Sequence, residues 1–281
     1  MKIIKISLIV FLLILIGYQV KSYDRIRENN GNAPIISSDV DEIQISCKYE
    51  KEDLLQGLSA YDPEDGYITE KILIGAFSDF TERGISSLEY AVYDKDGNIS
   101  TYNRKVIFND YSPPKIELIE PCVFKPTNDA NSIPSLQLKG VDMLDGDITR
   151  HILITDADID FSKPGKYTAS VYLKNSFGDD VSMDIPVHIL EPGQYGYEIE
   201  LKDPLIYIDK GADGSPRSYI AAIKNEYTGK VITDKEYKLT TNSSVDTSKD
   251  GIYEIQYSVI SSDKSQRGET WLTVVVGDYG D

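Results

Sequence analysis

The sequence D-M-L-D-G-D-I-T, residues 142–149, occurs in a related form, D-P-E-D-G-Y-I-T, at residues 62–69. Both stretches fit the pattern D-x-x-D-G-x-I-T and begin 80 residues apart. A weaker third copy follows, because S-K-P-G-K-Y at residues 162–167 returns as S-K-D-G-I-Y at residues 248–253. Internal repetition fixes the architecture of a chain before any single residue is interpreted. The spacing predicts three small repeats.

The segments around these motifs alternate polar and apolar residues, which is the pattern of half-buried β-strands. Turn residues separate them, as in the hairpin sequence at residues 94–98. Pro186 in the final strand of the second repeat suggests an edge position. No helical period appears after residue 20, so the sequence predicts an all-β chain of antiparallel β-sandwiches. The apolar positions of the alternations are Ile43, Ile45 and Cys47, then Leu88, Tyr90 and Val92, then Tyr167, Ala169, Val171 and Leu173, and finally Tyr253, Ile255, Tyr257 and Val259.

The predicted domains are residues 34–109, 113–190 and 197–277. Two short Pro-containing linkers join them, residues 110–114 and 191–196. Proline fixes φ, so these joints are expected to be extended and stiff.

Residues 1–20 form a membrane-targeting segment. Lys2 and Lys5 lie just before an apolar run from Ile6 to Val20. The run is short for the ~30 Å hydrocarbon core of a bilayer, so an uncleaved transmembrane helix is a marginal span. A cleaved signal peptide is the alternative, although Lys21 makes the best cleavage site poor. Both place the rest of the chain outside the cytoplasm, after a flexible spacer at residues 21–33.

The net charge of −17 disfavours binding to other negatively charged molecules. Nucleic acids and anionic lipid headgroups are bound by clustered Lys and Arg, and the sequence has no basic stripe. We therefore expect no nucleic-acid partner.

The combination of D-x-x-D-G-x-I-T with S-K-P-G-x-Y and an alternating strand resembles bacterial immunoglobulin-like repeats of cell-surface proteins. The second repeat fits best, the first has Tyr67 and Ser86 at two motif positions, and the third lacks the acidic motif. The resemblance covers residues 34–277. It implies three tandem immunoglobulin-like β-sandwich domains strung as an extracellular stalk, used for adhesion or for presenting another module. It implies no catalysis.

The acidic loops allow two interpretations. Asp62 and Asp65 in the first repeat, and Asp142, Asp145 and Asp147 in the second, could supply oxygen ligands to Ca²⁺. Calcium takes six to eight oxygens, and each loop offers far fewer. The favoured alternative is a turn before a strand, in which aspartate accepts hydrogen bonds from nearby backbone and glycine takes a positive φ.

The remaining chemistry-bearing residues predict no site. His151 and His188 have no neighbouring ligand at metal-binding spacing, so solvated or core roles are favoured. Cys47 and Cys122 lie in different repeats, which favours two buried thiols over a disulfide. We predict no catalytic, cofactor-binding or metal-binding residue.

The expected function is that of a non-enzymatic, membrane-anchored surface stalk for adhesion or presentation. The alternative is an extracellular module that binds a cell-wall glycan or a host protein. We expect a single-pass protein of the cell membrane with extracellular repeats, or a secreted one if residues 1–20 are cleaved. The third repeat is the expected contact region, because aromatic residues anchor interfaces; its sequence drift would equally follow from its terminal position. Its candidates are Tyr195, Tyr197, Tyr219 and Tyr227.

Overall fold

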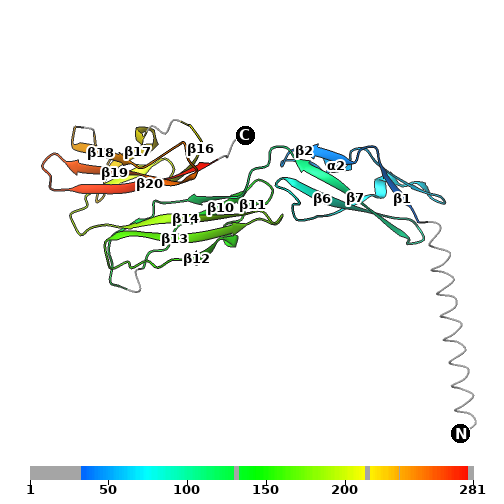
Figure 1. Cartoon of the computed structure of the whole chain (residues 1–281), viewed down its shortest axis with the longest axis horizontal. Coiled ribbons are helices and arrows are strands. Elements are labelled where there is room, and N and C mark those ends of the chain that lie inside the picture. Colours follow the sequence, from blue (N-terminus) through cyan, green and yellow to red (C-terminus); the bar gives the residue numbers. More distant parts are fainter. Residues whose placement is uncertain (1–32, 130–132, 213–215, 234, 278–281) are drawn as a thin grey trace, which may run out of the picture. The chain divides into compact units, whose positions relative to one another are not determined.

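The computed structural model describes residues 33–129, 133–212, 216–233 and 235–277. The chain divides into two compact units, unit 1 (Met1–Asn109) and unit 2 (Asp110–Asp281). Repeats 1, 2 and 3 denote here the strands within residues 34–109, 113–190 and 197–277 (Figure 1). The predicted anchor, residues 1–20, lies outside the described residues. Within the described ranges no helix is long and apolar enough to cross a membrane.

Repeat 1 consists of two sheets. A three-stranded sheet has the order β1 (Ile35–Ser38), β3 (Leu58–Asp62), β4 (Gly66–Tyr67). A four-stranded sheet has the order β2 (Glu42–Ile45), β7 (Ile99–Phe108), β6 (Ile85–Tyr93), β5 (Leu73–Phe77). A short helix, α2 (Lys51–Leu55), and a 3₁₀ turn, η1 (Thr69–Lys71), complete the repeat.

Repeat 2 has the same plan. Its three-stranded sheet runs β8 (Lys115–Leu118), β10 (Leu138–Asp142), β11 (Gly146–Asp147). Its four-stranded sheet runs β9 (Val123–Phe124), β14 (Asp180–Ile189), β13 (Gly165–Lys174), β12 (Leu153–Asp156). The 3₁₀ turn η3 (Thr149–His151) corresponds to η1.

Repeat 3 keeps the four-stranded sheet, in the order β16 (Leu205–Asp209), β20 (Arg267–Gly277), β19 (Gly251–Ser261), β18 (Tyr237–Ser243). Its second sheet has two strands, β15 (Tyr197–Leu201) and β17 (Ile220–Asn225), and η4 (Pro216–Tyr219) precedes β17. The residues that replace the acidic motif leave only an isolated bridge, Lys224 to Val231, where the other repeats have β4 and β11. The recurring strand order confirms the predicted repetition and an all-β, immunoglobulin-like sandwich.

The apolar positions of the predicted alternations form the cores. In β6 the side chains of Leu88, Tyr90 and Val92 are fully buried, and in β19 the same holds for Ile255, Tyr257 and Val259. Every second residue of a strand points to the same face, so one face supplies the core and the other meets solvent. The hairpin predicted at residues 94–98 joins β6 and β7, which pair from Tyr93 and Ile99 onward.

The expectation of purely antiparallel sheets is wrong in one respect. Each repeat contains one parallel pair, formed by β2 with β7, β9 with β14, and β16 with β20. In each pair an early strand crosses from the first sheet and lies beside the last strand of the repeat. Local turn signals cannot reveal such a pairing, because the partners are separated by most of the repeat.

β14 is an inner strand of its sheet, but Pro186 itself occupies an edge position, as predicted. Pro186 lies in β14, which is flanked by β13 on one side and β9 on the other. However, β9 pairs only with His188 and Ile189. Proline is therefore tolerated because it lies outside the part of β14 that β9 covers, where no ladder partner needs its missing N–H.

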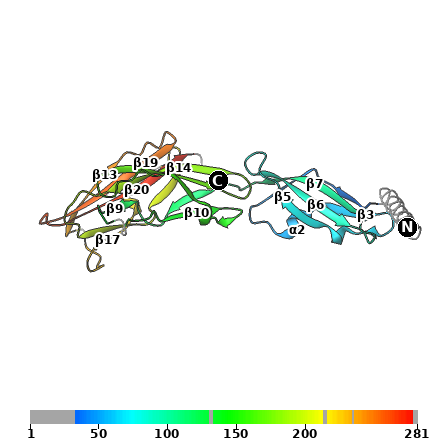
Figure 2. The same cartoon turned by 90° about the horizontal axis from the view of Figure 1, so that it is seen from below.

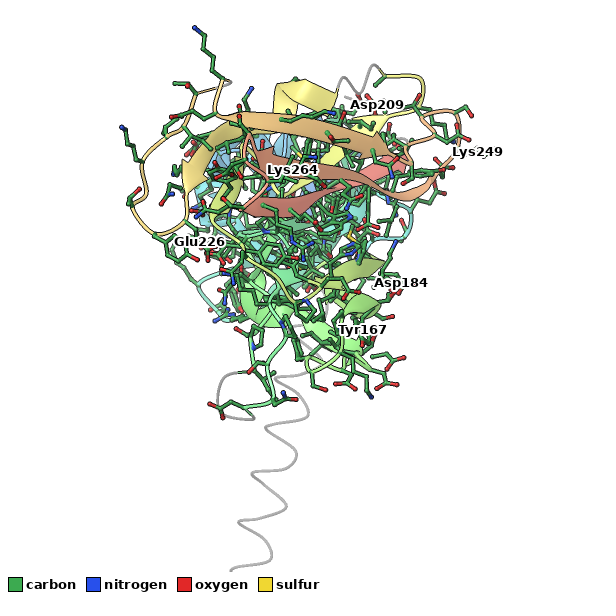
Figure 3. The ribbon with its side chains drawn as sticks, turned by 90° about the vertical axis from the view of Figure 1, so that its left-hand side faces the viewer. Tyr167, Asp184, Asp209, Glu226, Lys249 and Lys264 are labelled. Atoms are coloured by element: carbon green, nitrogen blue, oxygen red, sulfur yellow. The ribbon has the colours of Figure 1, made fainter. Side chains whose placement is uncertain are left out.

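Repeats 2 and 3 lie side by side within unit 2 (Figure 1, Figure 2). Leu205 and Val275 of repeat 3 belong to the same buried cluster as Ile116 and Ile185 of repeat 2. Figure 3 shows the strands of repeat 3 lying over those of repeat 2, with Glu226 at one side of the boundary. A joint with a shared apolar core differs from the expected extended one. The predicted boundary between residues 190 and 197 lies inside unit 2, whose two repeats share this core.

Candidate functional site

The acidic motif of repeat 2 forms a turn. Asp142 is buried, and its Oδ1 accepts hydrogen bonds from the backbone N–H of Leu144 and of Asp145, at 2.9 and 3.0 Å. Its Oδ2 accepts a third bond from the Asn175 side-chain amide at 3.0 Å. Gly146 has φ 71°, which the turn requires and which glycine adopts without strain. The motif therefore forms the turn that the sequence predicted.

Two further acids of this loop also have partners within the chain. Asp145 accepts bonds from the backbone N–H and the hydroxyl of Ser176, at 2.6 and 2.7 Å, and so ties the turn to the hairpin between β13 and β14. Asp147 accepts from the Thr149 N–H at 3.0 Å, and bonds from Thr149 hold the pKa of Asp147 below its ordinary value. Among the described residues no three His, Cys, Asp or Glu are grouped so as to hold a metal ion.

Repeat 1 repeats this arrangement with two differences, in the partner of the second Asp and in the residue that faces Oδ2 of the first. Asp62 Oδ1 accepts from the N–H groups of Glu64 and Asp65, and Asp65 accepts from Lys95, whose ammonium lies 2.8 Å away. The Lys95 bond is the main reason why the pKa of Asp65 is lowered. Asp94 stands where repeat 2 has the amide donor Asn175, and Asp62 Oδ2 is buried with no hydrogen-bond partner among the described residues. The second Asp of each motif therefore fastens a turn to a hairpin.

The two histidines differ in their surroundings. His151 is exposed in η3, whereas His188 of β14 is nearly buried at the junction of repeats 2 and 3. The His188 ring stacks on the Trp271 indole, with centroids 4.0 Å apart and planes 7° apart. Its Nε2 lies 2.5 Å from Glu254 Oε1, and the ammonium of Lys166 contacts the other oxygen of Glu254. This junction joins β13 and β14 to β19 and β20, and sequence spacing gave no sign of it.

The Glu254 carboxylate is held in its charged form by this junction. Burial is the largest influence and raises its pKa, but hydrogen bonds from His188 and Lys166 together outweigh burial and leave the pKa below its ordinary value. Hydrogen bonds to the charged form of an acid favour that form. The contact between the repeats is therefore ionic as well as apolar.

Cys47 and Cys122 are both buried thiols and do not form a disulfide with each other, as predicted. Burial raises the pKa of the Cys122 thiol to about 12. A thiol in that environment is protonated at neutral pH and unreactive, since the thiolate is the nucleophile. Both act as small apolar core residues.

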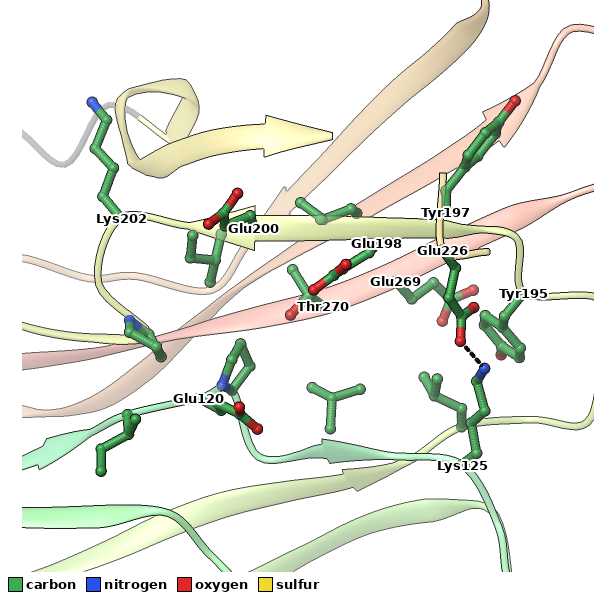
Figure 4. Close-up of a pocket in the computed structure, with 17 residues that line it drawn as sticks. Glu120, Lys125, Tyr195, Tyr197, Glu198, Glu200, Lys202, Glu226, Glu269 and Thr270 are labelled. Atoms are coloured by element: carbon green, nitrogen blue, oxygen red, sulfur yellow. Dashed lines mark hydrogen bonds and ion pairs between the residues drawn. The ribbon is translucent and has the colours of Figure 1, made fainter. Parts of the chain in front are cut away.

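A groove of about 630 Å³ lies between repeats 2 and 3 (Figure 4). One wall is β15 with the residues on either side of it, and the other is the segment around Pro121 and Val123 that leads into β9. Glu269 and Thr270 of β20 also line it. Figure 4 shows Glu198, Glu269 and Thr270 directed into the space between the walls.

The groove carries an excess of negative charge. Two of its five glutamates are paired, Glu226 with Lys125 across the groove and Glu200 with Lys224 at 2.6 Å. Glu120, Glu198 and Glu269 have no salt bridge among the described residues. Lys202 is the other lysine in the lining. The sequence analysis missed this groove, because its walls come from two repeats and no motif marks them.

The tyrosines predicted for contact have different positions. Tyr195 and Tyr197 line the groove, but Tyr195 is buried, with the guanidinium of Arg267 4.5 Å from its ring centroid. Tyr219 is half-buried against the repeat 3 core. Tyr227 is 70% exposed. The structure therefore brings two of the four to one site.

No family model matches this sequence. The chain is 27% identical over 228 residues to the pesticidal crystal protein Cry22Aa of Bacillus thuringiensis, a match that covers 79% of this chain and 30% of that protein. The chain thus spans less than a third of the curated relative's length. Among solved structures, Drosophila N-cadherin EC1-3 is 12% identical, with 72% of this chain and 80% of that one covered and a TM-score of 0.27. The CBM51-2 and INT domains of Clostridium perfringens ZmpB are 17% identical, with coverage of 87% and 42% and a TM-score of 0.22.

Proposed function

We propose that this chain is a non-catalytic surface protein that acts by binding. In this proposal residues 1–20 anchor it in the cell membrane as a single pass, or are cleaved to release it. The sandwiches then stand outside the cytoplasm as a stalk for adhesion or presentation. The partner that we propose for it is a surface protein or a cell-wall glycan.

The observation that supports it is the junction between repeats 2 and 3. Neighbouring domains move relative to one another by default unless their interface is large and apolar. Here Leu205 and Val275 enter the core of repeat 2, and the His188, Trp271 and Glu254 contacts fix the approach of the strands. A fixed pair of sandwiches suits a protein that presents a binding surface formed by both of them.

The groove of unit 2 favours binding over a purely passive stalk. Its volume falls in the range of roughly 300–1,000 Å³ that is usual for ligand sites. Its lining combines apolar side chains with aligned carboxylates, which gives both contact area and orientation.

The test is retention of the full chain on a surface. Full chain is attached to fluorescent beads and incubated with intact bacterial cells or purified cell wall, beside beads carrying an equally acidic unrelated protein. We expect saturable retention of the chain-bearing beads and no release of fragments from the wall. Retention no better than the control beads, or a chemical change in the wall that needs the chain, would overturn the proposal.

Location is tested separately. Protease added to intact cells should digest the repeats, because the proposal places everything after residue 20 outside the cytoplasm. Digestion only after cell lysis would contradict it.

A further inference from the structure

One edge of β15 has no paired strand among the described residues. In its sheet β15 pairs with β17 alone, from Tyr197 opposite Asn225 to Leu201 opposite Ile220. The carbonyl of Gly196 accepts from Glu226, and the N–H of Lys202 donates to Tyr219, both on the β17 side. Hydrogen bonding alternates along an antiparallel strand. The backbone N–H and C=O groups of Ile199 and Leu201 consequently point away from β17.

At the corresponding edge in repeat 2, the backbone N–H and C=O groups have hydrogen-bond partners. Ile116 of β8 pairs with Gly140 as Ile199 pairs with Ile223, so the two isoleucines occupy the same place. The hydroxyl of Tyr207 caps Ile116 from the open side, accepting from its N–H at 3.1 Å and donating to its C=O at 2.8 Å. Ile199 has no such cap among the described residues. An open row of backbone donors and acceptors is a template for another strand.

The surroundings of that edge select the charge of an incoming strand. The groove runs along β15 and contains the unpaired carboxylates of Glu120, Glu198 and Glu269. Each attracts a cation in a partly enclosed site, where charge interactions are less screened than in bulk water. An acidic or neutral strand would gain the same backbone bonds without this attraction.

We propose that the groove between repeats 2 and 3 binds an extended basic peptide, which adds as a strand to the free edge of β15. Backbone bonds to Ile199 and Leu201 supply affinity, and the three carboxylates supply selectivity for Lys or Arg side chains. At about 3.3 Å per residue, the strand contacts five residues of β15 over roughly 16 Å. This inference deepens the proposed binding function and rests on it.

The test is a titration of the full chain with a fluorescein-labelled decapeptide of alternating Lys and Val, followed by fluorescence anisotropy. Two peptides of equal length serve as controls. One replaces each Lys with Glu, and the other keeps Lys but carries N-methyl groups on alternate backbone nitrogens. We expect saturable binding of the first peptide, at least tenfold weaker binding of the methylated one, and no binding of the acidic one. Equal binding of the methylated peptide would overturn strand addition and indicate charge attraction only.

Variants locate the site. Glu198→Gln with Glu269→Gln should weaken binding of the basic peptide at least tenfold. The matched control is Glu89→Gln with Glu82→Gln in repeat 1, which makes the same change in net charge and should leave affinity within twofold. Charge reversal by Glu198→Lys should weaken the basic peptide and raise affinity for the acidic one. The inference is overturned if both double variants bind alike. Circular dichroism identical to wild type shows that each variant is folded.

This result can be separated from that of the bead assay. If beads are retained while the peptide does not bind, the groove inference fails and the surface-binding function stands. If the peptide binds while beads are not retained, the groove is a peptide site and the adhesive function fails.

Discussion

At the residue scale, one buried charge distinguishes repeat 1. Arg104 of β7 is 1% exposed and occupies the place held by Ile185 in repeat 2 and Leu272 in repeat 3. Its guanidinium donates to the carbonyls of Gln56 and Leu54, at 2.6 and 2.5 Å, and to the Tyr90 hydroxyl at 3.0 Å. Arg104 thus joins β7 to the C-terminal end of α2 by donating hydrogen bonds to its carbonyl groups.

We predict that Arg104→Met lowers the free energy of unfolding of unit 1 by about 3 kcal/mol. A methionine fills similar volume but removes the guanidinium donors to the carbonyls of Gln56 and of the buried Leu54, and each loss of a buried hydrogen-bond partner costs about 1–3 kcal/mol. Urea unfolding measures the change, with the exposed Arg150→Met as control. A loss below about 0.5 kcal/mol would show that packing, and not hydrogen bonding, is the role of Arg104.

The acidic turn gives a second prediction at this scale. Asp142→Ala removes three hydrogen bonds from a buried carboxylate and leaves Asn175 without one of its acceptors. We expect a loss of about 2–3 kcal/mol. Asp158→Ala, at an exposed position, should change stability by less than about 0.5 kcal/mol. Similar losses for the two variants would refute the structural importance of the turn.

Calcium should add little stability, because the carboxylate oxygens of Asp142 and Asp145 already accept bonds within the chain. A ligand at 100 times its dissociation constant would stabilise the protein by about 2.7 kcal/mol. The melting temperature of the full chain is compared with calcium and with a chelator. A rise of several degrees that Asp145→Ala abolishes would contradict the turn interpretation.

At the element scale, the junction between β13–β14 and β19–β20 makes unit 2 sensitive to acid. The pKa of Glu254 is lower in the folded protein, so its stabilisation is present above the unfolded pKa and is lost as pH falls through the folded value. We predict that the difference in unfolding free energy between wild type and Glu254→Gln shrinks as the pH falls below about 4.3. Other carboxyls titrate in both proteins and cancel in this difference. A difference that does not vary with pH would contradict the role given to Glu254.

The same elements show how far sequence reasoning reaches. The period-two alternations predicted β6, β13 and β19, and the repeated Asp-Gly motif predicted its turn, because both are local signals. The junction of His188 with Glu254 and Trp271 brings together segments more than 60 residues apart. No local pattern specifies such contacts, and the groove beside β15 depends on them. Local patterns likewise do not predict β9, or that it stops short of Pro186.

At the scale of the whole molecule, the central claim is that repeats 2 and 3 form one body that carries the binding surface. Separating them after Leu190 would expose Ile116 and its neighbours, which Leu205 and Val275 now cover. Binding experiments therefore need the full chain, and a fragment of repeat 3 alone would lose one wall of the groove.

Scanning calorimetry of the full chain with Leu205→Ala tests this claim most directly. Leu205 belongs by sequence to repeat 3 but is buried in the core cluster of repeat 2, and a buried Leu→Ala substitution costs about 2–5 kcal/mol. For 150–250 residues each kcal/mol lowers the melting temperature by about 2–4 °C. The account predicts two unfolding transitions, one for each unit. Leu205→Ala should lower the melting temperature of the unit 2 transition, which should remain a single transition, and should leave that of unit 1 unchanged. Three separate transitions, with only that of repeat 3 displaced by Leu205→Ala, would contradict it.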